Sequence, residues 1–241
     1  MIKRCLSGSA LKWIALTSML IDHFAAVFYI GSVVYAGKLI FPHSVYIALR
    51  LVGRLAFPLY AFLLAEGFRH TRSVEKYLCR LFLFGLLSEI PFDLAFRRTW
   101  VSWDYQNVFF TLFLGLLAVW LFNRITRGDP ARCGVLRTLL GLFCIVGAAA
   151  AADLGQTDYG AWGVLVIVSM VLFQEMEWMR DLLVGCFLLG ASAYEVAGLA
   201  DFVLFRLYNG QRGKQAKYVF YFFYPVHLLL LAFFCRAVFS T

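Results

Sequence analysis

Long apolar segments, separated by short polar or basic stretches, cover nearly the whole chain. A helix of about 20 apolar residues, rising 1.5 Å per residue, crosses a hydrocarbon core of about 30 Å. The pattern predicts helices over residues 11–31, 45–68, a stretch from the basic residues 69–80 to 96, 107–122, a segment ending in GAAAAADLG, a segment from Tyr159-Gly160 to 173, and 217–238. We therefore expect an all-α, polytopic transmembrane bundle.

Residues 182–208 fit this pattern least well. They contain Glu195, Asp201 and three glycines, and they are too short for two full spans. We expect two short or tilted helices that meet near Tyr194, followed by a surface loop with the sequence NGQRGK at 209–214. The expected count is about eight spans, within a range of eight to ten.

The basic residues alternate between the two sides of this layout. With a cytoplasmic N-terminus, sixteen Lys and Arg residues fall in cytoplasmic segments and four in outer segments, and Arg50 and Arg54 remain inside a helix. Lys and Arg collect on the cytoplasmic side of membrane proteins. The outer four are Lys38, Arg97, Arg98 and Arg236, and the layout places NGQRGK in the cytoplasm.

Composition narrows the class of protein. Hydrophobic residues make up 62% of the 241 positions and charged residues 15%, against about 25% charged in soluble domains. We expect one integral membrane domain over residues 1–241, with no cleavable signal peptide. The net charge of +8 follows from topology, so nucleic acid is not an expected partner. The six cysteines show no metal spacing, so we expect neither zinc nor disulfides.

An acidic residue and a histidine stand side by side in the first predicted span. A charged group at the bilayer centre costs at least about 2.5 kcal/mol, which makes Asp22 and His23 candidate functional residues. Their side chains diverge by about 100°, so they lie on adjoining stripes of the helix, Asp22 with Ser18 and His23 with Met19. The alternative is a polar pair that only joins helices.

Two arginines four residues apart share a face of the second predicted helix. Arg54 requires an anion, which is either a carboxylate such as Asp22 or Glu89 or a ligand phosphate. Arg50 has the alternative of extending toward the membrane surface. Pro91, in the stretch SEIPFD, bends the third predicted helix between Glu89 and Asp93.

Two further polar residues are candidates. Asn107 begins the fourth predicted helix, where it either caps the helix or donates a hydrogen bond to a reacting oxygen. His227 follows Pro225 in the last helix and is a second histidine at membrane depth. A lone buried histidine is more often structural, but two histidines beside carboxylates and arginines favour acid–base chemistry.

Two other functions use buried ionisable groups differently. A proton-coupled transporter would use Asp, Glu and His as a relay, and it predicts internal repeats with interrupted helices, which we do not find here. A scaffold protein would not need charges at mid-membrane. The sequence also lacks a phosphate-binding glycine loop, a GxSxG elbow and an HExxH motif.

Several motifs together resemble the TraX family, whose founding member acetylates the N-terminus of a conjugative pilin. The motifs are LKWIALTSMLIDHFAAVF, GRLAFPLYAFLLAEGF, SEIPFDLAF, QNVFFTLFLGLL, TDYGAWGVL, LYNGQRGKQAKYVFY and FFYPVHLLLL, and they extend over about residues 11–231. The opening also resembles the acyltransferase-3 family, in which a basic residue precedes a histidine by eleven positions, as Lys12 precedes His23. The arginine pair of that family is loosely matched by Lys76 and Arg80.

The resemblance implies a membrane acetyltransferase of the bacterial cytoplasmic membrane. It would move an acetyl group from cytoplasmic acetyl-CoA to an amine, such as the N-terminus of a pilin-like protein, or to a hydroxyl. His23 would be the general base, oriented by Asp22, with Arg54, Asn107 or His227 stabilising the oxyanion. The implied residues that bind acetyl-CoA or the acceptor are Lys12, Arg50, Arg54, Lys76, Arg80, Glu89, Asp93 and Tyr159.

Overall fold

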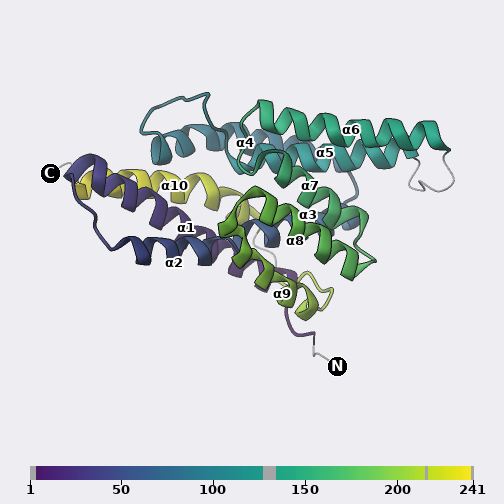
Figure 1. Ribbon diagram of the computed structural model, residues 1–241, viewed down its shortest axis with the longest axis horizontal. Coiled ribbons are helices and arrows are strands. Elements are labelled where there is room, and N and C mark those ends of the chain that lie inside the picture. The colour runs from purple at the N-terminus through teal and green to yellow at the C-terminus, as the bar shows by residue number, and fades with distance from the viewer. Residues whose placement is uncertain (1–3, 127–133, 215–216, 240–241) are drawn as a thin grey trace. The chain divides into compact units, whose positions relative to one another are not determined.

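The computed structural model describes residues 4–126, 134–214 and 217–239, and over these residues the chain is helical (Figure 1). The only β-type pairings in the described residues are two isolated bridges, Leu6 with Tyr208 and Gln106 with Thr157. The expected all-α class is confirmed. Three of the sixteen residues counted as cytoplasmic, Lys3, Arg127 and Arg132, lie outside the described residues.

The helices follow the predicted order closely. Their bounds are α1 Gly8–Ala36, α2 His43–Gly53, α3 Ala56–His70, α4 Val74–Phe96, α5 Val108–Thr126, α6 Val135–Leu154, α7 Gly160–Leu172, α8 Glu177–Ala191, the 3₁₀ helix η1 Ala193–Ala200, α9 Asp201–Leu207 and α10 Lys217–Phe239. The stretch 182–208, which fits the apolar pattern least well, comprises most of α8 followed by η1 and α9. The junction between α8 and η1 falls near Tyr194, as expected.

Five helical segments in the described part of the chain are long and apolar enough to cross a membrane. They are Gly8–Ala36, His43–His70, Val108–Thr126, Val135–Leu154 and Val219–Phe239. Helix α7 is apolar but has only 13 residues. The expected count of about eight is loosely consistent with these five segments, because α4, α7 and α8 are further helices that are shorter or more polar.

The second predicted helix is interrupted, which the apolar pattern did not indicate. Helix α2 ends at Gly53 and α3 begins at Ala56, with Arg54 and Leu55 in a turn between them. Pro58 explains the break, because its ring has no N–H for the carbonyl four residues earlier, that of Arg54, and its ring clashes with that carbonyl.

The described chain groups into two compact units. Unit 1 comprises Met1–Tyr60, Leu86–Ser102 and Tyr194–Thr241, and unit 2 comprises Ala61–Gly85 and Trp103–Ala193. Helices α3 and α4 each contribute residues to both units. In unit 1, α1 packs against α2 and α10 (Figure 1).

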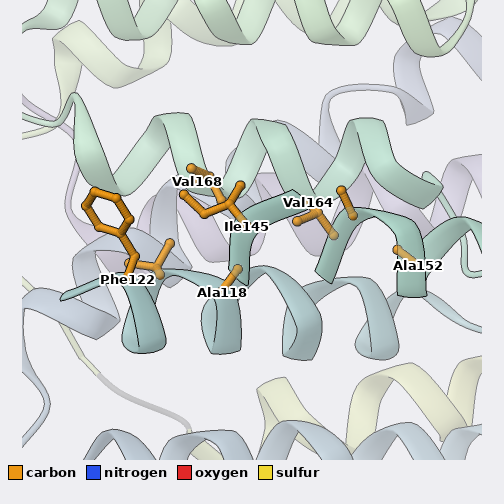
Figure 2. Packing of buried hydrophobic residues seen from close by; sticks show 8 residues of the cluster. Ala118, Phe122, Ile145, Ala152, Val164 and Val168 are labelled. Carbon is orange, nitrogen blue, oxygen red and sulfur yellow. The ribbon is translucent and has the colours of Figure 1, made fainter. Parts of the chain in front are cut away.

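Unit 2 is built on close packing of α5, α6 and α7. Figure 2 shows Ala118 and Phe122 of α5, Ile145 and Ala152 of α6, and Val164 and Val168 of α7 meeting in one buried cluster. Small residues permit this approach, as expected for the run at 147–155. An added Cβ on Gly115 of α5 would lie 2.6 Å from the Cδ1 atom of Ile167 of α7.

The loop NGQRGK holds the start of α1. The amides of Gly8 and Ser9 donate to the carbonyls of Gln211 and Arg212 at 2.8 and 3.0 Å, and the Ser7 hydroxyl accepts from the Ala10 amide at 3.2 Å. The amides of the first helical turn are therefore satisfied by the protein. Residues 209–214 are otherwise exposed or half-exposed, which confirms the expected surface loop.

Candidate functional site

A cluster of four charged side chains joins three elements of unit 1. Asp22 of α1 accepts hydrogen bonds from the Nη1 atom of Arg50 at 2.6 Å and from the Nη2 atom of Arg54 at 2.7 and 2.8 Å. The Nη1 atom of Arg54 donates to Glu195 of η1 at 2.9 Å. Asp22 and Glu195 are 5% and 2% exposed. Two carboxylates and two guanidinium groups balance, so the cluster has no net charge.

The end of α2 fits closely around Asp22. A Cβ atom on Gly53 would lie 2.1 Å from the Oδ1 atom of Asp22, so a side chain at this position would displace the carboxylate. One turn earlier on α1, the Ser18 hydroxyl donates to the carbonyls of Val52 and Gly53 at 2.6 and 3.2 Å. The last carbonyls of a helix lack intrahelical partners, and here the Val52 carbonyl also accepts from the Leu55 amide at 3.4 Å. The stripe of Ser18 and Asp22 therefore faces α2.

Glu195 is the member of this cluster that sequence reasoning did not select as a site residue. The available signal was a carboxylate in the stretch 182–208, which is too short for two full spans. An ionisable residue at membrane depth nearly always faces the protein interior and pairs there. Its partner could not be predicted from the sequence, because Glu195 bonds Arg54 across 141 positions of the chain.

The second stripe of α1 faces α10, where two histidines meet. The Nδ1 atom of His23 lies 2.7 Å from the Nε2 atom of His227. The ring planes differ by 4° and the ring centres are 5.0 Å apart. Because the nitrogens are much closer than the centres, the rings meet edge to edge in nearly one plane, as a linear hydrogen bond requires.

Helices α1 and α10 run parallel at this contact. Eight residues after each histidine, Gly31 of α1 meets Cys235 of α10, and an added Cβ on Gly31 would lie 2.2 Å from the Cys235 sulfur. The Cys235 thiol contacts the carbonyl of Val27 at 3.5 Å. Glycine thus allows the two helices to approach closely enough for the imidazole rings to bond.

Aromatic rings and a backbone carbonyl hold the histidine pair. Phe96 and Tyr224 contact His23 edge to face, with ring centres 5.4 and 5.8 Å away. Phe223 stacks on His227 at 4.7 Å, and its carbonyl oxygen lies 2.6 Å from the Nδ1 atom of His227. His227 is 5% exposed, whereas His23 is partly exposed.

The expected link between Asp22 and His23 is absent. The partner of the His23 ring is His227, and the carboxylate of Asp22 is held by Arg50 and Arg54. The two stripes face different helices rather than one shared partner. Of the alternatives for Arg54, pairing with Asp22 is confirmed. Arg50 also bonds Asp22, with its side chain 25% exposed.

Three other expected site residues lie in unit 1. The ammonium of Lys12 lies 5.0 Å from the centre of the Phe220 ring. Asp93 is fully buried and accepts a hydrogen bond from the amide of Ser102 at 2.6 Å. Glu89 is on the same helix, α4, and the proline between the two carboxylates, Pro91, lies inside that helix.

The remaining four expected site residues lie in unit 2. Asn107 caps α5, accepting from the amide of Phe109 at 3.0 Å and donating to the carbonyl of Gly85 at 2.9 Å. The capping interpretation of Asn107 is thereby confirmed. The Arg80 guanidinium lies 5.6 Å from the Tyr77 ring centre, and Lys76 is exposed. Tyr159 precedes α7 with a left-handed backbone, φ +67°.

Comparison with known proteins identifies the family of this chain. The family model described as TraX protein matches residues 7–234. The chain is also 30% identical to the probable fimbrial assembly protein FimC, serogroup H1, of Dichelobacter nodosus, over 93% of this chain and 94% of that protein. No solved structure matches the chain. The chain belongs to the TraX family.

Proposed function

We propose that this chain is an acetyltransferase of the bacterial cytoplasmic membrane, with acetyl-CoA as donor and a pilin-like protein as acceptor. The observation that carries the proposal is the histidine pair: His23 is partly exposed, and its Nδ1 atom is held 2.7 Å from a buried second histidine. A fixed imidazole with one nitrogen available is the usual form of a general base.

The reaction needs only groups of the kind present in unit 1. The nitrogen or oxygen of the acceptor attacks the carbonyl carbon of the thioester with its lone pair. His23 removes the proton from that nitrogen or oxygen at the same time. The tetrahedral intermediate then collapses, the carbon–sulfur bond breaks, and His23 returns the proton to the sulfur of CoA. A positioned general base contributes about 10²–10⁴-fold to such a rate.

The contacts change the role that we assign to three residues. Both terminal nitrogens of Arg54 bond carboxylates, and both ring nitrogens of His227 have partners. We therefore assign Arg54 and His227 to holding the site, not to stabilising the oxyanion. The side-chain amide of Asn107 also has partners: it donates to the Gly85 carbonyl and accepts from the Phe109 amide of α5. These bonds support a structural role.

Basic residues at the start of α1 suit the phosphates of CoA. Lys12 precedes His23 by eleven residues, a rise of roughly 16 Å along the helix. The backbone of Arg212 is bonded to Ser9 in the turn before Lys12. Phosphate groups favour Lys and Arg partners. We expect the nucleotide end of CoA near Lys12 and the thioester near His23, both in unit 1.

A pilin-like acceptor fits the relative that matches this chain over nearly its whole length. That protein is named as a probable fimbrial assembly protein. A hydroxyl acceptor would use the same base in the same way.

Two measurements test the proposal separately for donor and acceptor. For the donor, acetyl-CoA should raise the thermal unfolding midpoint of the purified protein in detergent, since a ligand at 100 times its dissociation constant adds about 2.7 kcal/mol to folded-state stability. No shift at millimolar acetyl-CoA would contradict the acetyltransferase proposal.

For the acceptor, intact pilin from cells with this protein should be heavier by one acetyl group than pilin from cells without it. Equal masses would exclude pilin as the acceptor.

A further inference from the structure

The contacts of His227 determine where its proton lies. Its Nδ1 atom is 2.6 Å from the carbonyl oxygen of Phe223, one turn earlier on α10. A carbonyl can only accept a hydrogen bond, so Nδ1 of His227 must carry the hydrogen. A neutral imidazole has one N–H, and the Nε2 atom of His227 is therefore an acceptor.

The bond to His227 in turn determines which ring nitrogen of His23 carries the hydrogen. Its Nδ1 atom is 2.7 Å from the Nε2 atom of His227, so Nδ1 of His23 must be the donor in that bond. The Nε2 atom of His23 is then left with a free lone pair. We propose that His227 is a positioning residue that fixes His23 in the Nδ1–H tautomer and so makes Nε2 of His23 the base, an inference that rests on the proposed acetyl transfer.

The neutral state of the pair follows from its surroundings. His227 is 5% exposed, and its partners are an imidazole, a carbonyl and aromatic rings. A charged ring at this position would be buried without a carboxylate, which is costly. Asp22, which precedes His23 in the sequence, is already held by two arginines.

The tautomer matters because it determines which nitrogen can react. With Nδ1 tied to His227, the proton taken from the acceptor enters on Nε2 and leaves from Nε2 to the sulfur of CoA. The opposite tautomer would present an N–H to the acceptor and could not act as a base there. A partner on the second ring nitrogen is the usual device that sets this choice.

The direct test is ¹⁵N NMR of the full-length protein with ring-labelled histidine, in detergent micelles. His43→Ala and His70→Ala identify the other two signals, since the chain has four histidines. We expect His23 and His227 each to show a protonated Nδ1 and an unprotonated Nε2. A proton on Nε2 of His23 would overturn the inference, even if acetyl transfer were intact.

Two substitutions add a functional readout. In His227→Gln, the side-chain carbonyl can replace Nε2 as acceptor, so transfer should stay within about 10-fold of wild type. In His227→Leu, nothing accepts from His23, and kcat should fall about 10²–10⁴-fold with an unchanged KM for acetyl-CoA. Equal, large losses in both variants, or no loss in His227→Leu, would overturn the positioning role. Absence of transfer by the wild-type protein would instead contradict the proposed function and leave the NMR test of the tautomer decisive.

Discussion

At the residue scale, Arg54 is the centre of the charged cluster. Its two terminal nitrogens bond Asp22 of α1 and Glu195 of η1, so one planar fork links two elements far apart in sequence. Lysine cannot replace it well, because a point charge on a flexible stem does not match two carboxylates at fixed positions. The pair of carboxylates would repel each other without it.

Removal of Arg54 should therefore destabilise the fold strongly. Arg54→Met leaves Glu195 without this partner and Asp22 with one arginine, and the loss of one partner of a buried ion pair costs about 3–5 kcal/mol. Arg50→Met is the matched control and should cost less, because Asp22 keeps its bonds to Arg54. Unfolding free energies in a denaturing detergent titration measure both. Equal losses would show that Arg54 has no special position.

Sequence reasoning predicted the residue types at this site better than their partners. A buried arginine demands an anion, so Asp22 was one of the three predicted partners of Arg54, with Glu89 and a ligand phosphate. The His23–His227 contact and the role of Glu195 were not predicted, because they depend on which helices pack together. Helical periodicity gives the direction of a side chain but not the identity of the facing helix.

At the element scale, the break between α2 and α3 forms part of the site. At this helix end the Ser18 hydroxyl of α1 donates to the carbonyls of Val52 and Gly53. The periodicity of apolar residues predicted a continuous helix here, since Arg54 and Leu55 do not disturb the pattern. Pro58 was the local signal for the break, but a proline is also tolerated inside membrane helices, so it does not determine where a helix stops.

Loss of the Ser18 hydroxyl should be costly for this reason. Ser18→Ala removes this donor from the buried Gly53 carbonyl, whereas the Val52 carbonyl keeps the Leu55 amide, and an unsatisfied buried acceptor costs about 1–3 kcal/mol. Ser169→Ala is the matched control: the two serines are equally buried, at 3% exposure. The Ser169 hydroxyl bonds the Leu165 carbonyl of its own helix, so its loss should cost under about 1 kcal/mol. A larger loss for Ser169→Ala would contradict this account of the helix end.

Gly53 gives a steric test of the same helix end. Gly53→Ala places a Cβ atom 2.1 Å from the Asp22 carboxylate, and such overpacking costs about 1–3 kcal/mol. Gly147→Ala, in α6, is the control because no atom outside the local helix backbone lies within 4 Å of the added Cβ, so it should stabilise by about 0.5–1 kcal/mol. Thermal unfolding of the two variants should shift in opposite directions. A stabilised Gly53→Ala would mean that Asp22 does not lie against this glycine.

At the scale of the whole molecule, the distribution of basic residues and the contacts of the loop 209–214 both indicate which side of the membrane carries the start of α1. The distribution of basic residues predicts that NGQRGK lies in the cytoplasm. Within unit 1, this loop is hydrogen-bonded to the first turn of α1, so the loop and the start of α1 share one side of the membrane. Composition and hydropathy were sufficient to predict an all-α membrane protein, because the bilayer permits few other architectures.

Cysteine labelling in intact cells tests this topology. In a cysteine-free background, Gln211→Cys should react with a membrane-impermeant maleimide only after the cells are opened. Trp103→Cys, 84% exposed and in a predicted outer segment, should react in intact cells. Reaction of Gln211→Cys in intact cells would place the loop and the start of α1 outside and would contradict the predicted orientation.

The central claim is that His23 is the base in acetyl transfer from acetyl-CoA, and transfer by a purified variant tests it most directly. Labelled acetyl-CoA and pilin are incubated with wild type, His23→Ala and His43→Ala, the last an exposed histidine bonded to Tyr29 at 2.9 Å. We expect His23→Ala to bind acetyl-CoA normally and to lose about 10²–10⁴-fold in transfer rate, with His43→Ala close to wild type. A His23→Ala variant that transfers acetyl groups at the wild-type rate would contradict the account.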